Sequence, residues 1–196
     1  MSRLIYLGLR TFFRLVNSIK VRGLEKVPPS GPLIIACNHL SNADPPALMS
    51  FTAIVRLPSV IAKKELFSFR PFGWFLRSVG AIPVDRRREG GDLGALRGCL
   101  SVLAGGGCLV IFPEGTRALG RKLRPKHGVA LMAHKSGAPV LAARIFNSDN
   151  FSKLGKITIK YGGIRYFEPA ENQDLRAAYE SFSEAVMSDI FSITEE

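Results

Sequence analysis

The sequence predicts an α/β fold, a single domain in which helices flank a central, largely parallel sheet, preceded by an N-terminal amphipathic, membrane-associated helix. Short apolar runs alternate with segments of helical spacing from residue 20 onward, which is typical of this class. The chain has 196 residues, enough for one domain with a substantial core. The sequence contains no internal repeat and no interdomain linker. Residues 1–20 are therefore assigned to the N-terminal helix and residues 21–196 to the α/β domain.

The expected elements can be placed along the chain by their apolar patterns. Short β-branched, apolar runs predict strands at residues 20–23, 33–37, 59–62, 81–85, 108–112, 140–146 and 156–162. Apolar side chains at helical spacing predict helices at residues 46–51, 72–79, 93–104, 129–135 and 174–193.

The first 20 residues predict a helix that lies in a membrane interface. On a helical projection Arg3, Arg10 and Arg14 share one narrow arc, and apolar side chains, among them Phe12 and Phe13, cover the rest. This pattern favours a helix whose apolar face enters the bilayer while its arginines meet the head groups. Packing of the apolar face on the domain is the alternative, and both can hold in part. The arginines interrupt the core of any signal peptide, and no apolar run is long enough to span a bilayer.

The composition is strongly basic. Lys and Arg number 27 against 16 Asp and Glu, which gives a net charge of +11. Such a surface attracts an anionic membrane, a phosphorylated substrate, an acidic carrier protein or nucleic acid, and the charge alone does not choose among them. Three cysteines without CxxC spacing argue against a disulfide framework and favour a reducing compartment. Cys37 stands near His39 and could form a nucleophilic pair with it, although a free cysteine in an apolar strand is usually part of the core.

The stretch CNHLSNADPP places His39 and Asp44 five residues apart, directly after an apolar run. A regular helix would separate these side chains by about 140°, so they can meet only in a turn. Asp44 precedes a proline, which disfavours helical backbone at Asp44, and Pro46 suits the first turn of the next helix. Asp44 can then fold back on the imidazole and fix its tautomer. As a lone motif, however, the spacing fits a helix cap beside a satisfied histidine at least as well.

Two more polar clusters follow predicted strands. The run DRRR contains three consecutive arginines, the first of which is Arg86, and guanidinium groups are well suited to bind phosphate. The run PEGTR contains Glu114 and Gly115, and a glycine lets backbone approach a ligand closely. Lys126 stands just before the next helix, whose N-terminus favours anions. Because ligands of open α/β sheets bind at the carboxyl ends of strands, all three clusters are expected in one site. The alternatives are a solvated basic loop for the arginines and a structural ion pair or cap for Glu114.

Four segments occur in order and carry a resemblance: NHLSNAD, AKKELF…PFGWFLRSVGAIPVDR, FPEGTR and KHGVALMAHKSGAPV. Together they resemble the glycerolipid acyltransferase family, and within it the lysophosphatidic acid acyltransferases, over residues 21–145. An HxxxxD motif is weak by itself, but with FPEGTR about 75 residues later it is highly specific.

The resemblance implies roles for single residues. His39 would be the general base and Asp44 its charge-relay partner. The positions that would bind the acceptor phosphate and shape the acceptor site are Arg86, Glu114, Gly115, Thr116, Arg117 and Lys126. In the fourth segment Pro139 matches the family, but Ala142 stands where a second proline is usual, in a block associated with the acyl donor.

The activity implied by the resemblance is transfer of a fatty acyl group from a thioester, acyl-CoA or acyl carrier protein, to the free hydroxyl of lysophosphatidic acid, giving phosphatidic acid. No cofactor and no metal are expected, only the thioester as co-substrate. The expected partners are a membrane phospholipid surface, the lysophospholipid acceptor and the thioester carrier, but not nucleic acid. The expected place is the cytoplasmic face of the cell membrane, as a peripheral, monotopic protein.

Two alternatives stay open for the function. The acceptor could be a lyso-ornithine lipid or another lysophospholipid, since arginine binds carboxylate as well as phosphate. More distantly, the chain could be a non-catalytic basic module that binds membrane or nucleic acid.

Overall fold

A computed structural model describes residues 1–85, 92–121 and 123–195 and confirms the α/β class. Within these residues one sheet has the strand order β1-β7-β6-β2-β5-β3-β4. Its strands are β1 (Lys20–Arg22), β2 (Leu33–Cys37), β3 (Pro58–Lys63), β4 (Ala81–Val84), β5 (Cys108–Ile111), β6 (Val140–Phe146) and β7 (Thr158–Arg165). The β6–β7 pair is antiparallel and the other pairs along this order are parallel, so the sheet is largely parallel, as predicted.

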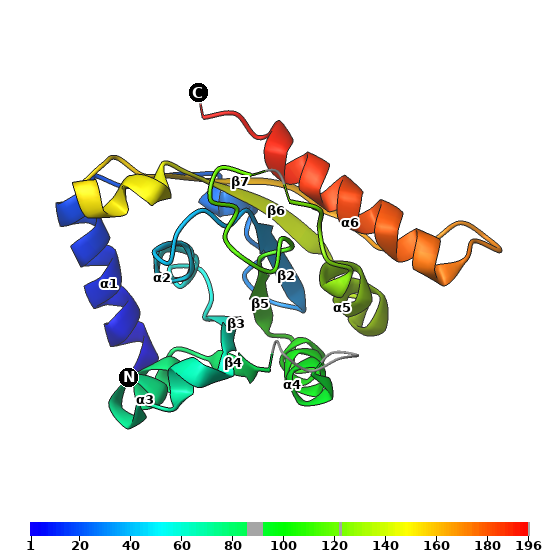
Figure 1. Ribbon diagram of the computed structural model, residues 1–196, viewed down its shortest axis with the longest axis horizontal. Coiled ribbons are helices and arrows are strands. Elements are labelled where there is room, and N and C mark those ends of the chain that lie inside the picture. The colour runs from blue at the N-terminus through cyan, green and yellow to red at the C-terminus, as the bar shows by residue number, and fades with distance from the viewer. Residues whose placement is uncertain (86–91, 122, 196) are drawn as a thin grey trace.

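Helices cover both faces of the sheet (Figure 1). They are α1 (Ser2–Asn17), α2 (Asp44–Thr52), α3 (Arg70–Ser78), α4 (Leu93–Ala104), α5 (Gly128–Ser136) and α6 (Leu175–Ser192). Residues of α1 and α2 join one core cluster, and residues of α4, α5 and α6 join the other. The result is three layers, with the sheet in the middle.

Strand β2 lies in the interior of this sandwich. All five of its residues are buried, and they alternate between the two clusters: Leu33, Ile35 and Cys37 face α1 and α2, while Ile34 and Ala36 face the other helices. A central parallel strand is covered on both faces, which explains why its sequence is a continuous apolar run. The chain that leaves β2 therefore emerges near the middle of one sheet edge.

Several boundaries differ from the expected ones for local reasons. Helix α1 ends at Asn17, because Ser18 adopts a left-handed conformation (φ 43°, ψ 48°) and Lys20 begins a strand. Helix α3 begins at Arg70, which leaves Pro71 in the first turn, where its missing N–H costs no intrahelical hydrogen bond. Helix α2 includes Asp44, so the proline that follows it did not exclude a helical start.

Pairing with neighbours decides the remaining differences. Strand β7 runs to Arg165 because it pairs with β6 as far as that residue. Short 3₁₀ helices, which no periodicity indicated, are η1 (Leu24–Lys26), η2 (Lys64–Phe67) and η3 (Ser148–Lys153).

Candidate active site

The carboxyl ends of β2, β5, β3 and β4 meet at one edge of the sheet because these strands are parallel. His39 follows β2 by two residues and Glu114 follows β5 by three. The structure brings these two predicted clusters together, and hydrogen bonds join them. Arg86, the predicted phosphate ligand after β4, lies outside the described residues.

His39 and Asp44 are in direct contact. His39 Nδ1 lies 2.8 Å from Asp44 Oδ2. Because a carboxylate only accepts hydrogen bonds, Nδ1 is the donor in this contact, and in the neutral tautomer of the ring Nε2 is then the acceptor. The Asp44 side chain is fully buried, whereas that of His39 is 12% exposed. The imidazole is therefore oriented from inside the protein and still reachable from outside.

Asp44 organises the turn that carries the histidine. Its Oδ2 also accepts hydrogen bonds from the backbone N–H groups of Leu40 (2.6 Å) and Ser41 (2.7 Å). These donors precede α2, and within the described residues no side chain caps the start of that helix. Asp44 thus serves the turn and the imidazole, and the interpretation as a helix cap is wrong.

Glu114 holds the backbone of His39. Its Oε2 accepts a hydrogen bond from the backbone N–H of His39 at 2.5 Å, and Glu114 as a whole is 3% exposed. On the other side, the backbone N–H of Ala118 donates to the His39 carbonyl at 2.8 Å. The segment after β5 therefore fixes both polar groups of the His39 backbone.

The surroundings of the Glu114 carboxyl group change its pKa. Burial raises its pKa above the ordinary value, and the nearby charge of Asp44 adds to the rise. The hydrogen bond from the His39 backbone and the His39 imidazole act in the opposite direction, but burial dominates.

Two neighbours of His39 are not evident from the sequence motifs. The imidazole stacks on Phe112, with ring centroids 4.4 Å apart and an angle of 29°. The buried Asn38 donates its side-chain amide to the Ile145 carbonyl (2.9 Å) and accepts from the Ile145 N–H (2.8 Å). Asn38 thereby ties the chain to β6 just before His39. A polar residue directly after an apolar run was the available sign for Asn38, and an aromatic residue before the PEG turn was the sign for Phe112.

Gly115 and Lys126 lie against each other. Gly115 has a φ of +69°, and a Cβ there would come within 2.7 Å of Lys126 Cδ and Cε. The backbone N–H of Lys126 donates to the Pro113 carbonyl at 2.8 Å, which brings its stem over the glycine. Thr116 and Arg117 follow as exposed residues, and within the described part of the chain no hydrogen bond or ion pair joins them to His39 or Asp44.

Cys37 does not suit the nucleophilic role. Its side chain is completely buried at the end of β2. Burial raises the pKa of the thiol well above its ordinary value, and the nearby Asp44 and Glu114 raise it further. The reactive thiolate is therefore disfavoured, and a Cys–His pair is not supported.

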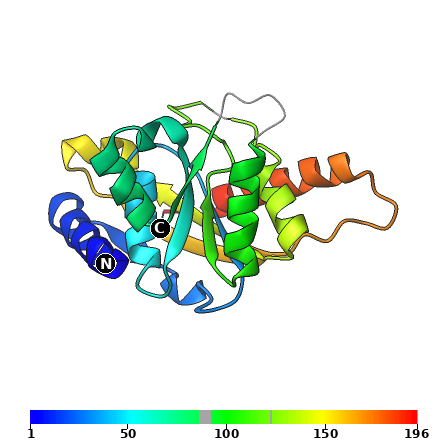
Figure 2. The same ribbon diagram turned by 90° about the horizontal axis from the view of Figure 1, so that it is seen from below.

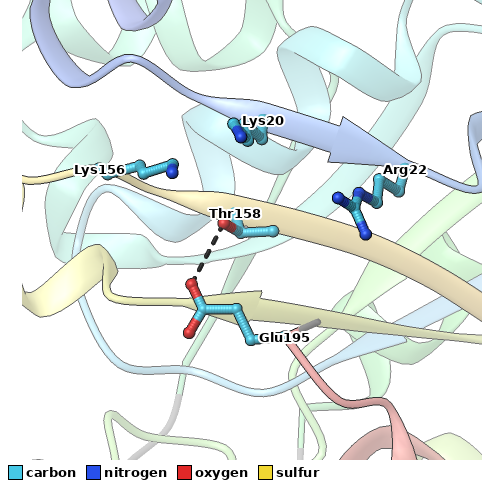
Figure 3. A pocket seen from close by; sticks show the side chains of 5 residues that line it. All are labelled: Lys20, Arg22, Lys156, Thr158 and Glu195. Atoms are coloured by element: carbon cyan, nitrogen blue, oxygen red, sulfur yellow. Dashed lines mark hydrogen bonds between the residues drawn. The ribbon is translucent and has the colours of Figure 1, made fainter.

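Other features of the described residues lie apart from this site. No three or more His, Cys, Asp or Glu side chains in residues 1–85, 92–121 and 123–195 are grouped so that they could hold a metal ion. A cavity of about 200 Å³ lies at β1 and β7, lined by Lys20, Arg22, Lys156, Thr158 and Glu195 (Figure 3). Strand β1 is three strands away from β2 in the sheet, so this cavity is not part of the His39 site. Each helix of the described residues is too short or too polar to cross a bilayer.

Comparison with known proteins gives a consistent picture. The model of the family described as Acyltransferase matches residues 18–145, which include His39, Asp44, Glu114 and Lys126. The 1-acyl-sn-glycerol-3-phosphate acyltransferase of Bacillus subtilis is 32% identical over 139 residues, covering 69% of this chain and 66% of the relative. The protein of the same name from Borreliella burgdorferi is 34% identical over 135 residues, covering 68% of this chain and 53% of the relative.

Chain lengths differ among the relatives. A chloroplastic 1-acyl-sn-glycerol-3-phosphate acyltransferase of Brassica napus is 28% identical over 148 residues, but the match covers 42% of that protein. The chain thus spans about two fifths of the length of this plant relative. Among solved structures, the 1-acyl-sn-glycerophosphate (LPA) acyltransferase PlsC of Thermotoga maritima superimposes with a TM-score of 0.74 at 24% identity. That match covers 100% of this chain and 81% of the other, and at this identity it shows a shared fold.

Proposed function

The chain belongs to the Acyltransferase family, and on that premise we propose that it transfers a fatty acyl group from an acyl thioester to the free hydroxyl of lysophosphatidic acid, forming phosphatidic acid. The observation that carries the proposal is the 2.8 Å contact between His39 Nδ1 and Asp44 Oδ2 at the sheet edge that also holds Glu114. The names of the bacterial relatives support the choice of acceptor.

In the proposed mechanism His39 acts as a general base. Its Nε2 takes the proton from the acceptor hydroxyl, and Asp44 stabilises the imidazolium that forms. The hydroxyl oxygen attacks the thioester carbonyl, the C–S bond of the tetrahedral intermediate breaks, and the imidazolium returns its proton to the departing thiolate. The product is an ester and a free thiol. Acyl-CoA and acyl carrier protein are both proposed as thioester carriers.

Glu114 is proposed as a positioning residue. It binds the backbone of His39 and leaves the imidazole free for the substrate. Because a displacement of about 1 Å can cost a catalytic group about 100-fold in rate, a fixed His39 backbone supports efficient proton transfer.

The acceptor phosphate is assigned to Arg86, with Lys126 as a second cation and Gly115, Thr116 and Arg117 as the adjoining wall. Support comes from the described neighbours of Arg86. Asp85 follows β4 at the same sheet edge as His39, and its backbone N–H donates to Asp92 Oδ2 at 2.8 Å. Lys126 is held over Gly115 beside Glu114.

The protein is proposed to work as a peripheral protein on the cytoplasmic face of the cell membrane. Helix α1 presents an apolar stripe to solvent, with Leu15 79% exposed. The net charge of +11 suits a leaflet that carries anionic lipids.

Labelled acyl transfer tests this function. Purified protein is given acyl-CoA or acyl carrier protein as donor and a panel of lysolipids as acceptors, including lysophosphatidic acid and a lyso-ornithine lipid. We expect lysophosphatidic acid to be the preferred acceptor. His39→Ala should lower kcat by at least about 100-fold, the usual contribution of a general base. His134→Ala is the matched control, because His134 lies on α5 and contacts Tyr179 instead.

Three outcomes would contradict the assignments. Near wild-type turnover by His39→Ala would refute the mechanism. If Arg86→Ala weakened acceptors with and without phosphate equally, Arg86 would not be a phosphate ligand. Membrane binding that survives His39→Ala, with no transfer detected for any donor, would favour the non-catalytic basic module.

A further inference from the structure

Large apolar side chains are exposed in the segment that joins β3 to β4. We name Leu66, Phe69, Phe72 and Trp74 the aromatic patch; they lie in η2, in α3 and between them. Phe69 is 70% exposed and Trp74 is 57% exposed. Their neighbours Phe67, Phe75 and Leu76 pack against the core, so the segment is anchored while the patch meets solvent.

The patch is carried by a firmly packed support. A Cβ on the buried Gly73 would come within 2.6 Å of the Phe67 carbonyl oxygen, so α3 and η2 are in close contact. The guanidinium of Arg77 lies 5.3 Å from the centroid of the Phe67 ring. The exposed side chains of the patch are therefore carried by a folded, packed part of the chain.

Positive charge lies beside Trp74. Lys63 and Lys64 are paired with the carboxylates of Glu65 and Asp85, so the charge that no ion pair of the described residues offsets comes from Arg70 and Arg77. Arg70 and Arg77 stand four residues before and three residues after Trp74, which places them on the same side of α3 as the indole. Helix α3 contains no acidic residue.

The patch begins at the edge of the sheet that holds His39, and the far end of α3, which leads back to the start of β4, contacts α1. Strand β3 is parallel to β5, and its carboxyl end at Lys63 leads directly into η2. Ser2 Oγ donates to the Ser78 carbonyl at 2.7 Å, and Tyr6 Oη donates to the Val79 carbonyl at 2.7 Å. The N-terminal half of α1 thus borders the end of α3, as Figures 1 and 2 show.

We propose that the aromatic patch is a second membrane-docking element, which enters the interface of an anionic phospholipid bilayer next to α1. Tryptophan and phenylalanine side chains favour this interface, and the guanidinium groups of Arg70 and Arg77 attract anionic head groups. Docking by two elements holds the His39 edge of the sheet close to the lipid surface. A membrane-borne acceptor then reaches the proposed base without leaving the bilayer completely, a consequence that rests on the proposed function.

The chain contains its own probe for this proposal, because Trp74 is its single tryptophan. Wild-type protein is mixed with vesicles of phosphatidylglycerol and phosphatidylcholine in equal parts, or of phosphatidylcholine alone. We expect the Trp74 emission to shift to shorter wavelength with the anionic vesicles and to be quenched by lipids with brominated acyl chains. Protein that sediments with vesicles while Trp74 emission stays unchanged would overturn the proposal, since α1 alone would then dock.

Paired substitutions provide the second test. The variant with Phe69→Ser and Phe72→Ser should bind anionic vesicles at least about tenfold more weakly, because less apolar surface enters the lipid. The control carries Tyr166→Ser and Leu175→Ser, two exposed apolar residues between β7 and the start of α6, at the far end of the molecule from α3 (Figure 1). Equal binding by both variants would refute the patch.

Two further measurements distinguish lipid docking from a role of the patch in catalysis or in self-association. Transfer to a short-chain, water-soluble lysophosphatidic acid should be unchanged in the patch variant, and a loss of that activity would place the patch in the chemistry instead. A shift of Trp74 emission with protein concentration and no lipid would reveal self-association through the patch and would also overturn the proposal.

Discussion

At the scale of single residues, His39 is held by its backbone as much as by its ring. Asp44 binds the imidazole, Phe112 stacks on it, and Glu114 and Ala118 bind the backbone N–H and C=O. Glu114 and Ala118 come from the PEGTR segment and the residue that follows it, about 75 residues later in the chain. The close contact between the two motifs explains why both are needed to form one site.

Glu114 predicts a dependence of stability on pH. Burial raises its pKa, so the folded state holds the proton more tightly than the unfolded chain does. This contribution is complete below the ordinary pKa of 4.5 and is lost as pH rises through the raised value. The stability of the wild type minus that of Glu114→Gln should therefore fall with rising pH and then level off. Urea unfolding over a pH series measures the difference, and a difference that grew with pH would contradict the assignment.

Gly115 predicts a separable effect on acceptor binding. Gly115→Ala and Gly120→Ala both place a side chain at positive φ, +69° and +79°, and each should cost about 1 kcal/mol of stability. Only the Cβ at Gly115 meets the stem of Lys126. If Lys126 binds the phosphate, KM for lysophosphatidic acid should rise about tenfold in Gly115→Ala and stay near wild type in Gly120→Ala. Thermal unfolding and steady-state kinetics supply the two values, and equal KM values would remove Lys126 from the phosphate site.

At the scale of elements, α1 divides its apolar residues between two surroundings. Phe13 is buried, and its ring lies 5.7 Å from that of Phe151. Leu4 and Leu15 point to solvent on the same helix. Packing on the domain, one alternative for this helix, is therefore observed for part of its apolar face, and the exposed part stays available for the predicted membrane contact.

This division predicts different effects of substitutions on stability and on membrane binding at the buried and the exposed positions of α1. Phe13→Ala should lower the free energy of unfolding by about 3–5 kcal/mol, because it leaves a cavity in the core. The double substitution of Leu4 and Leu15 by Ser should change stability by less than about 0.5 kcal/mol each and should weaken binding to anionic vesicles. Chemical denaturation and vesicle sedimentation test both statements. Loss of stability in the leucine variant would show that this stripe packs on protein.

At the scale of the whole molecule, the excess of positive charge favours the proposed contact with an anionic membrane. The net charge of +11 belongs to a domain that carries both the His39 site and the exposed apolar side chains of α1 and α3. An anionic membrane attracts such a domain over a range set by the ionic strength.

Added salt should therefore weaken binding of the protein to the membrane that contains the acceptor, and it should leave the rate of the chemical step unchanged. Raising NaCl should weaken sedimentation with phosphatidylglycerol vesicles at least about tenfold. With lysophosphatidic acid embedded in those vesicles, apparent KM should rise while kcat stays near its low-salt value. A fall in kcat with unchanged KM would contradict this view.

The sequence by itself determined the class of fold, most elements and the two motifs of the site. Apolar runs such as Leu33–Cys37 and the helical spacing in Leu93–Ala104 are local patterns, and the structure reproduces those bounds. The resemblance to the acyltransferases was also readable, because its motifs are contiguous stretches of sequence.

Only the tertiary structure decided how these pieces meet. The strand order, the bonds of Asn38 to Ile145 and of Glu114 to His39, and the exposure of Trp74 all depend on contacts between segments far apart in the chain. Periodicity reports which side of an element is apolar, but not what covers that side. For the same reason it could not separate the part of α1 that packs on the core from the part that faces solvent.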